Sequence, residues 1–257
     1  KRNNPSPLDL ELAQGQGLLN NQKPGEALAV FQQALKSSPQ SPRIHFAIAQ
    51  ALEALGKEDE AVKFYEEAAK LAPKFLKALD CLARLYEKQG KADLATAQIK
   101  KAAKLSPRNA QRHVTLGKIL LEQGNTAEGM RALEQANERA GNDANLTAEV
   151  GEALLAAGLN AEAADAFGRA VSMDPNQVHL YNRMGIAFRR QKRFKEAIEQ
   201  YKKAIKAAPQ DENLQYNLAV ALAESGQYEA SRQTLKLALK LNPEFTEAKQ
   251  LLQRLAR

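Results

Sequence analysis

Three histidines and a single cysteine are the side chains in this 257-residue chain best suited to catalysis or metal binding. They form no metal-binding motif, because no two of them have a spacing such as Cys-x2-Cys or His-x3-His. Nothing in the sequence places a histidine beside Cys81, so a buried and inert thiol is expected. We therefore expect neither an enzyme nor a bound metal or cofactor.

The remaining polar residues follow the pattern of helical surfaces. Glutamates and aspartates recur four residues from lysines, as in ion pairs along a solvated helix. No glycine-rich stretch has the spacing of a phosphate-binding loop. Alanine, leucine, lysine, glutamate and glutamine dominate and strand signals are missing, so we predict an all-α protein whose helices position any functional side chain.

These predicted helices are organised by a period of 34 residues. Six of the seven positions in this register hold proline, and the fourth holds Gly141. The prolines are Pro39, Pro73, Pro107, Pro175, Pro209 and Pro243. The seven repeats cover residues 8–41, 42–75, 76–109, 110–143, 144–177, 178–211 and 212–245. A fixed period of this length is typical of a repeat array that grows along one axis.

Small residues recur where helices must approach one another. Position 27 of every repeat is alanine, and position 8 is glycine or alanine. Position 24 carries a large apolar side chain throughout, namely Phe31, Tyr65, Ile99, Leu133, Phe167, Tyr201 and Leu235. This combination of small and large residues predicts close helix packing within and between repeats.

The sixth repeat shows the motif most fully, as Tyr181-x2-Met184-Gly185-x2-Phe188, Ala197-x3-Tyr201 and Pro209. This pattern resembles the tetratricopeptide repeat, a helix-turn-helix unit. The resemblance implies a right-handed α-solenoid, a superhelix of antiparallel helix pairs, with helices over about positions 1–14 and 17–30 of each repeat. We expect residues 1–7 to be a linker and residues 246–257 to be an amphipathic capping helix.

Two repeats depart from the pattern. The first repeat has Gln22 at position 15, where five other repeats have a glycine that can end a helix in a left-handed conformation. The fourth repeat has Gly129 inside its second helix and Gly141 in place of proline. Because a glycine inside a helix lowers stability by about 1 kcal/mol relative to alanine, we predict that the fourth repeat is weak and divides the array.

The net charge of +7 and the isoelectric point of about 9.4 arise mainly in two repeats. The third repeat carries +5 and the sixth +6, whereas the fifth carries −4. A nucleic-acid surface needs a continuous basic stripe, so nucleic-acid binding is a weaker alternative. No apolar run reaches the roughly 18 residues that span a bilayer, and a single cysteine fits a reducing compartment. We therefore expect a cytoplasmic protein.

The resemblance also implies a ligand site. In tetratricopeptide arrays the first helices line a concave groove, mainly through positions 2, 5, 9, 12 and 13, and this groove commonly holds a peptide. The implied residues here are His179, Asn182, Ile186, Arg189, Arg190, Asn213, Tyr216, Asn217 and Val220 in repeats six and seven, and Lys77, Arg84 and Lys88 in repeat three. Because arginine bonds both oxygens of a carboxylate, we expect an acidic or C-terminal segment of a partner protein. His45 and His113 occupy position 4, where the family carries a packing aromatic.

The function implied by this resemblance is a protein-interaction scaffold that binds a partner peptide or extended segment. One alternative is the non-catalytic arm of a larger bacterial signalling protein, attached for example to a receiver domain; the start at Lys1 rather than methionine agrees with a piece of a longer chain. Another is that the basic clusters are only a solvated face. The groove positions do not match the clamp of chaperone-binding members, and formation of a homo-oligomer stays open.

Overall fold

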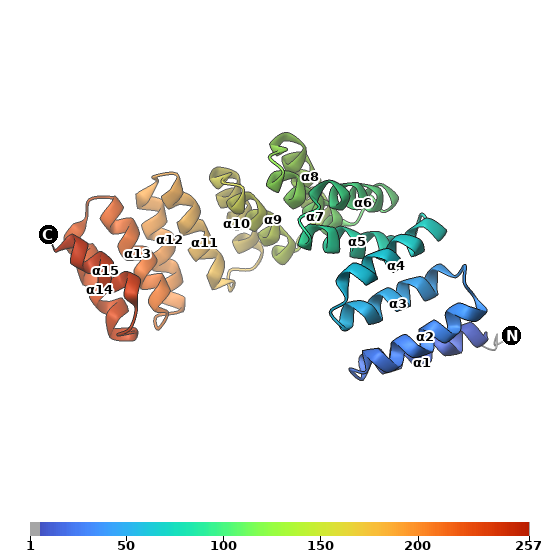
Figure 1. The fold of residues 1–257 in the computed structure, drawn as a ribbon. Coiled ribbons are helices and arrows are strands. Elements are labelled where there is room, and N and C mark those ends of the chain that lie inside the picture. The colour runs from blue at the N-terminus through green and yellow to red at the C-terminus, as the bar shows by residue number, and fades with distance from the viewer. Residues whose placement is uncertain (1–5, 257) are drawn as a thin grey trace. The chain divides into compact units, whose positions relative to one another are not determined.

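The computed structural model describes residues 6–256, which contain helices and no strand. Residues 1–5 of the expected linker and residue 257 of the expected capping helix lie outside this range. The helices are α1 (Pro7–Asn20), α2 (Pro24–Ser37), α3 (Pro42–Ala54), α4 (Glu58–Leu71), α5 (Leu76–Lys88), α6 (Ala92–Leu105), α7 (Ala110–Glu122), α8 (Thr126–Ala140), α9 (Ala144–Ala156), α10 (Asn160–Met173), α11 (Val178–Arg190), α12 (Phe194–Ala207), α13 (Glu212–Glu224), α14 (Tyr228–Leu241) and α15 (Thr246–Leu255). Over the described residues they form seven consecutive pairs and one final helix, the predicted α-solenoid (Figure 1).

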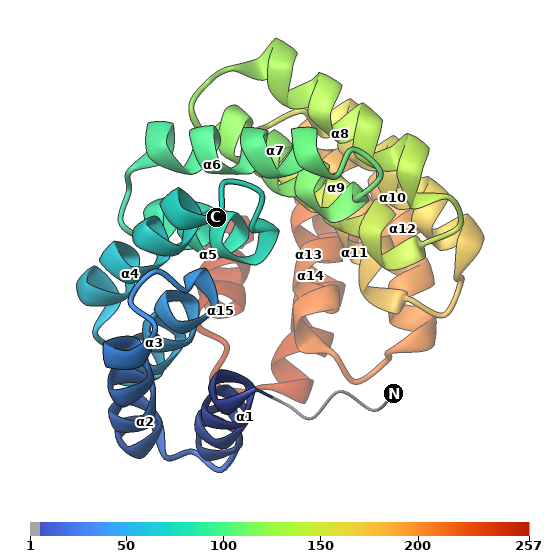
Figure 2. The ribbon, with the colours of Figure 1, turned by 90° about the vertical axis from the view of Figure 1, so that its right-hand side faces the viewer.

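The chain divides into two compact units, Lys1–Ile119 and Leu120–Arg257. The boundary lies within α7, the first helix of the fourth repeat. In the first unit α1 packs on both α2 and α3. Each helix from α2 to α5 then packs against the next one along the chain (Figure 2). In the second unit each helix from α8 to α15 packs against the next one along the chain.

The turn between the two helices of a pair has a left-handed residue at position 15, as predicted. Gly56, Gly90, Gly124, Gly158 and Gly226 have φ between 71° and 82°. Gln22 and Lys192 adopt the same conformation without being glycine, with φ of 59° and 60°. The turn geometry is therefore kept in all seven repeats, and two of them adopt it with a residue that rarely has this conformation.

Local signals also set the helix ends. Ser6 caps α1 by accepting a hydrogen bond from the Asp9 backbone N–H, and the Asp9 carboxylate accepts from the Ser6 backbone in return. Helix α1 therefore begins at Pro7, one residue before the first repeat was expected to start. The second helices end two residues before the period prolines, as α4 does at Leu71. In repeat four, which has Gly141 instead of proline, α8 continues to Ala140.

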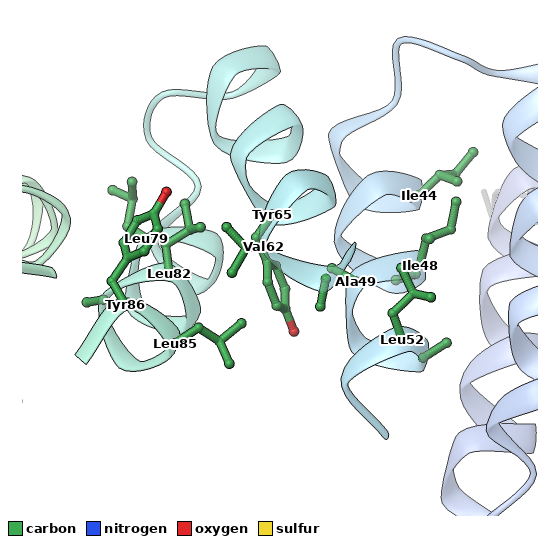
Figure 3. Close-up of a cluster of buried hydrophobic side chains, with 14 of the residues drawn as sticks. Ile44, Ile48, Ala49, Leu52, Val62, Tyr65, Leu79, Leu82, Leu85 and Tyr86 are labelled. Atoms are coloured by element: carbon green, nitrogen blue, oxygen red, sulfur yellow. The ribbon is translucent and has the colours of Figure 1, made fainter. Parts of the chain in front are cut away.

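The predicted pairs of small and large residues form the core. All seven alanines at position 27 are fully buried, and the large side chains at position 24 are at most 2% exposed. Figure 3 shows this arrangement in the first unit, where Tyr65 and Val62 of α4 lie between two helices. Helix α3 contributes Ile48 and Leu52 on one side, and α5 contributes Leu82 and Leu85 on the other. Helix α4 is thus packed between the first helices of two repeats.

Position 24 is aromatic in four repeats, and in three of them the residue at position 8 is a glycine that the ring approaches closely. A Cβ at Gly185 would lie 2.5 Å from the ring of Tyr201, and one at Gly151 would lie 2.6 Å from the ring of Phe167. The final helix α15 closes the second unit by placing Ala248, which is fully buried, against Leu235 of α14.

Candidate functional site

Two of the three histidines, the side chains best suited to catalysis or metal binding, form hydrogen bonds that stabilise the fold. The ring Nε2 of His45 donates to the carbonyl oxygen of Pro39 at 2.8 Å, and Nε2 of His113 does the same to Pro107 at 3.1 Å. Both rings are buried, which confirms the predicted packing role. Each ties the first helix of a repeat to the turn that precedes it. His179 lies exposed near the start of α11.

Cys81 is partly buried on α5, and burial raises the pKa of its thiol. Among residues 6–256, no group of three or more histidine, cysteine, aspartate or glutamate side chains is arranged to hold a metal ion. Within the same residues, no helix combines the length and apolar character that crossing a membrane requires.

The two arginines predicted to bind a ligand in repeat six already have partners. Arg189 forms an ion pair with Glu224 of α13, with Nη1 and Oε1 2.8 Å apart. Arg190 donates from Nη1 to the carbonyl oxygen of Leu155 at 2.9 Å, close to the end of α9. These contacts join repeat six to the repeats on both sides of it, so neither guanidinium is unengaged in this structure.

The predicted asparagines lie together. Asn217 of α13 donates from Nδ2 to Oδ1 of Asn182 on α11, 3.0 Å away. This bond leaves the Asn182 amide hydrogens and the Asn217 carbonyl oxygen for other partners. Tyr216 packs on Phe245 instead, with ring centroids 5.1 Å apart. Ile186 and Val220 are partly buried and Asn213 is exposed, so the structure brings together the two amides while Tyr216 belongs to the packing of α15.

Two of the three basic residues predicted in repeat three, Arg84 and Lys88, are also paired, with acids of the preceding repeat. Arg84 bonds Glu53 at 2.6 Å, and Lys88 forms an ion pair with Glu58. The same relation recurs along the first unit in the pairs Arg43–Asp9, Arg112–Asp80 and Lys118–Glu87. Counting charge by repeat concealed these contacts, because each joins two repeats. Such exposed pairs contribute about 0–1 kcal/mol each, and they neutralise cations that looked available for a ligand.

A cavity of about 810 Å³ lies along the first helices of repeats one to three. Its lining residues are Asp9, Leu12, Ala13, Gln16, Arg43, Phe46, Ala47, Gln50, Phe75 and Lys77. Phe46 and Phe75 pack together in its wall, with ring centroids 4.9 Å apart. Lys77 is exposed and has no ion-pair partner within the described residues. We call this cavity the first-unit groove.

Only Lys77 of this groove was among the predicted site residues. The others occupy positions 2, 5, 6 and 9 of repeats one and two, together with Phe75 at position 34. The position rule that selected residues in repeats three, six and seven would therefore have found most of them. Repeats one and two each carry a net charge of −1, so positive charge does not mark these positions as it marks repeats three and six.

This array of helix pairs, with its left-handed turns and small residues at fixed positions, defines a helical repeat protein with a groove along its first helices. The sequence model of the tetratricopeptide repeat matches residues 12–74 and 149–212, and a second model of the same description matches residues 86–148 and 188–255. The chain therefore belongs to the tetratricopeptide repeat family. A comparison with curated proteins finds no match.

Solved structures of tetratricopeptide repeat proteins share this fold. The C-terminal part of a repeat-containing protein from Cytophaga hutchinsonii is 20% identical and superposes with a TM-score of 0.76, covering 93% of this chain and 98% of the other. YrrB, described as a protein of this family with an unusual peptide-binding site, is 18% identical with a TM-score of 0.50, covering 86% and 96%. A chain of the APC/C hetero-tetramer Cut9–Hcn1 is 18% identical with a TM-score of 0.57; the match covers 99% of this chain but only 50% of that one.

Proposed function

We propose that this protein is a non-catalytic interaction scaffold and that its first-unit groove holds an extended segment of a partner protein. The observation that carries the proposal is the cavity of about 810 Å³ in which aromatic, amide and cationic side chains meet. Peptide grooves use this mixture, since apolar walls supply affinity and a few polar groups fix orientation. The peptide-binding site named for YrrB supports a ligand of the same class.

Each kind of side chain in the groove has a separate role in this proposal. The Phe46 ring and its partner Phe75 offer an apolar wall for one side chain of the ligand. The amides of Gln16 and Gln50 have both a donor and an acceptor, which suits the backbone of an extended chain. Arg43 is offset by Asp9 at 2.7 Å, so Lys77 remains the cation for an acidic side chain or a C-terminal carboxylate.

The predicted residues of repeats six and seven form a separate candidate surface within the second unit. Asn182 and Asn217 keep unused amide groups beside the partly buried Ile186, which suits contact with a peptide backbone. An acidic ligand there must compete with Glu224 for Arg189. We therefore assign acid recognition to Lys77 in the first-unit groove, and we assign to the asparagines only backbone contact within the second unit. A reducing, cytoplasmic location is proposed as well, on the strength of the single cysteine.

The test uses peptides selected from a random library, displayed with free C-termini, on the purified protein. We expect selected peptides to contain an apolar residue near an aspartate, a glutamate or the terminal carboxylate. Lys77→Glu should weaken their binding at least tenfold by fluorescence anisotropy, because it replaces attraction with repulsion. Lys74→Glu is the matched control: it has the same charge change on an exposed residue outside the cavity, and should have little effect.

Two results would contradict the proposal. One is a library that yields no binder to the folded protein. The other is a set of binders whose affinity is the same for the Lys77→Glu and Lys74→Glu variants. If those binders are instead lost on Asn182→Ala, the ligand site lies in the second unit and the assignment of the first-unit groove is wrong.

A further inference from the structure

A second cavity lies in the second unit, away from the first helices that line the peptide groove. It has a volume of about 480 Å³ and is formed mainly by the second helices α8 and α10, with α9 at its base. Met130 and Leu133 of α8 and Leu154 of α9 supply its apolar part. Nothing in the proposed peptide site uses this cavity, which we call the outer pocket.

The rim of the outer pocket is acidic. Glu134 and Glu138 come from α8, and Glu162 and Asp165 come from α10, against a single arginine, Arg169. Within residues 6–256, Glu134, Glu162 and Asp165 form no hydrogen bond or ion pair. This differs from the first unit, where Asp9, Glu53, Glu58, Asp80 and Glu87 all pair with bases. Carboxylates held around an apolar surface favour a cationic partner.

A buried polar atom at the same place points to a ligand that donates hydrogen bonds. Oδ1 of Asn137, on the α8 wall of the outer pocket, is shielded from solvent and has no hydrogen-bond partner among residues 6–256. An unsatisfied buried acceptor is costly, at about 1–3 kcal/mol. A lysine ammonium that enters between the carboxylates carries three donors and no acceptor, which matches this wall.

The chain itself carries a surface with the complementary composition, on α6 in the first unit. Leu94 and Leu105 of α6 are 47% and 40% exposed, so two large apolar side chains of one helix are open to a partner. One stripe of α6 carries Leu94, Lys101 and Leu105, which are seven and four residues apart and so share a helix face. The exposed Lys104 lies beside this stripe. We call this stripe the α6 face. It presents two leucines with cations between them, where the outer pocket presents apolar residues with carboxylates around them.

We propose that the α6 face of one copy docks into the outer pocket of a second copy. The contact is head-to-tail, because the two surfaces differ, so each copy keeps one unused face and further copies can add. The small size of the pocket makes the association weak, in the range of transient contacts. The docking uses mainly second helices and none of the residues that line the first-unit groove, so the groove stays available for its peptide.

Sedimentation velocity of the purified protein over a concentration series tests this contact. The weight-average mass should rise above the 28.2 kDa of one copy as concentration increases into the millimolar range. Lys101→Glu with Lys104→Glu should weaken association more than about tenfold, and so should Glu162→Lys with Asp165→Lys. Mixing the two double variants should restore association, because each then meets a surface of opposite charge.

A matched control separates local docking from overall charge. Each lysine-to-glutamate change lowers the net charge by two, so the α6 double variant falls from +7 to +3. If only net charge mattered, this variant would associate more strongly than the parent, whereas the proposal requires it to associate less. Lys202→Glu with Lys206→Glu, on exposed residues of α12, makes the same charge change and should keep parental association.

Circular dichroism of each variant checks that the helices remain, since all the replaced side chains are polar residues outside the core. The proposal is overturned if the parent stays at the mass of one copy throughout the concentration series. It is also overturned if neither double variant changes association, or if the mixture of the two does not recover it.

Discussion

Arg190 donates a hydrogen bond from Nη1 to the carbonyl oxygen of Leu155, 2.9 Å away in the preceding repeat. Leu155 belongs to the last turn of α9, whose carbonyl groups lack partners within the helix. A cation at this end also interacts favourably with the helix dipole. Arg190 therefore has a structural role between repeats five and six, at a position where the sequence suggested a ligand-binding side chain.

We predict that Arg190→Ala lowers the free energy of unfolding by about 1 kcal/mol, because the carbonyl loses a charged donor. Urea unfolding followed by circular dichroism measures this change. Lys195→Ala is the control in the same repeat, since Lys195 is exposed and has no ion pair among the described residues. A variant of Arg190 as stable as the control would show that the hydrogen bond contributes nothing.

Two glycines inside helices, Gly185 of α11 and Gly168 of α10, should respond in opposite ways to substitution by alanine, because only the first has no room for a methyl group. Gly185→Ala places a methyl group 2.5 Å from the Tyr201 ring, so overpacking should destabilise the protein by about 1–3 kcal/mol. Gly168→Ala places one 3.7 Å from Met184, an ordinary contact, and should stabilise α10 by up to about 1 kcal/mol. Equal unfolding midpoints for the two variants would contradict the packing described for position 8.

Tyr201 should make stability depend on pH in the alkaline range. Burial raises its pKa to about 12, against a smaller opposing effect of Arg189. Between the ordinary tyrosine pKa of about 10 and this value, the unfolded chain releases the proton and the folded chain keeps it, so stability falls as pH rises. Urea midpoints measured across this window should fall less steeply for Tyr201→Phe than for the parent.

At neutral pH the same substitution should not destabilise the fold, because the Tyr201 hydroxyl is buried without a hydrogen-bond partner in the described residues. Tyr65→Phe is the matched control, since its hydroxyl donates to Glu53 at 3.1 Å. It should cost about 0.5–1.5 kcal/mol. Identical losses for the two variants would mean that the two hydroxyls have the same surroundings.

Helix α8 should exchange its amide hydrogens faster than the second helices of the other interior repeats. It contains Gly129, has Gly141 as its C-cap and follows the boundary between the two compact units. Solenoid stability is a sum of repeat and neighbour terms, so a weak repeat opens more readily than those around it. Hydrogen exchange read by mass spectrometry measures this directly. Uniform protection of α6, α8 and α10 would rule out a weak fourth repeat.

The fold was predictable because its determinants are local and periodic. Helix α4 spans Glu58–Leu71, which are positions 17–30 of its repeat as predicted. The same small and large residues that mark the period, such as Ala204 and Tyr201, form the buried contacts. A pattern repeated seven times averages out single departures, so Gln22 disturbs neither its turn nor the register.

The site was less predictable, because side-chain partners depend on distances between repeats. Arg84 and Arg189 bond acids that lie 31 and 35 residues away in the sequence, and a count of charge within one repeat cannot detect such pairs. The outer pocket depends on the spacing of α8 and α10, which no sequence period encodes. The sequence did indicate that Asn182, at position 5, and Asn217, at position 6 of the next repeat, are neighbours, since both lie on first helices of adjacent repeats.

The ion pairs between repeats limit how this gene can gain or lose repeats. Deleting residues 76–109 would preserve the proline period, and Lys118 would take the place of Arg84 opposite Glu53. Glu122, however, would take the place of Lys88 opposite Glu58, so two like charges would meet at the new junction. The repeats are therefore not interchangeable units, because each junction pairs particular acids with particular bases.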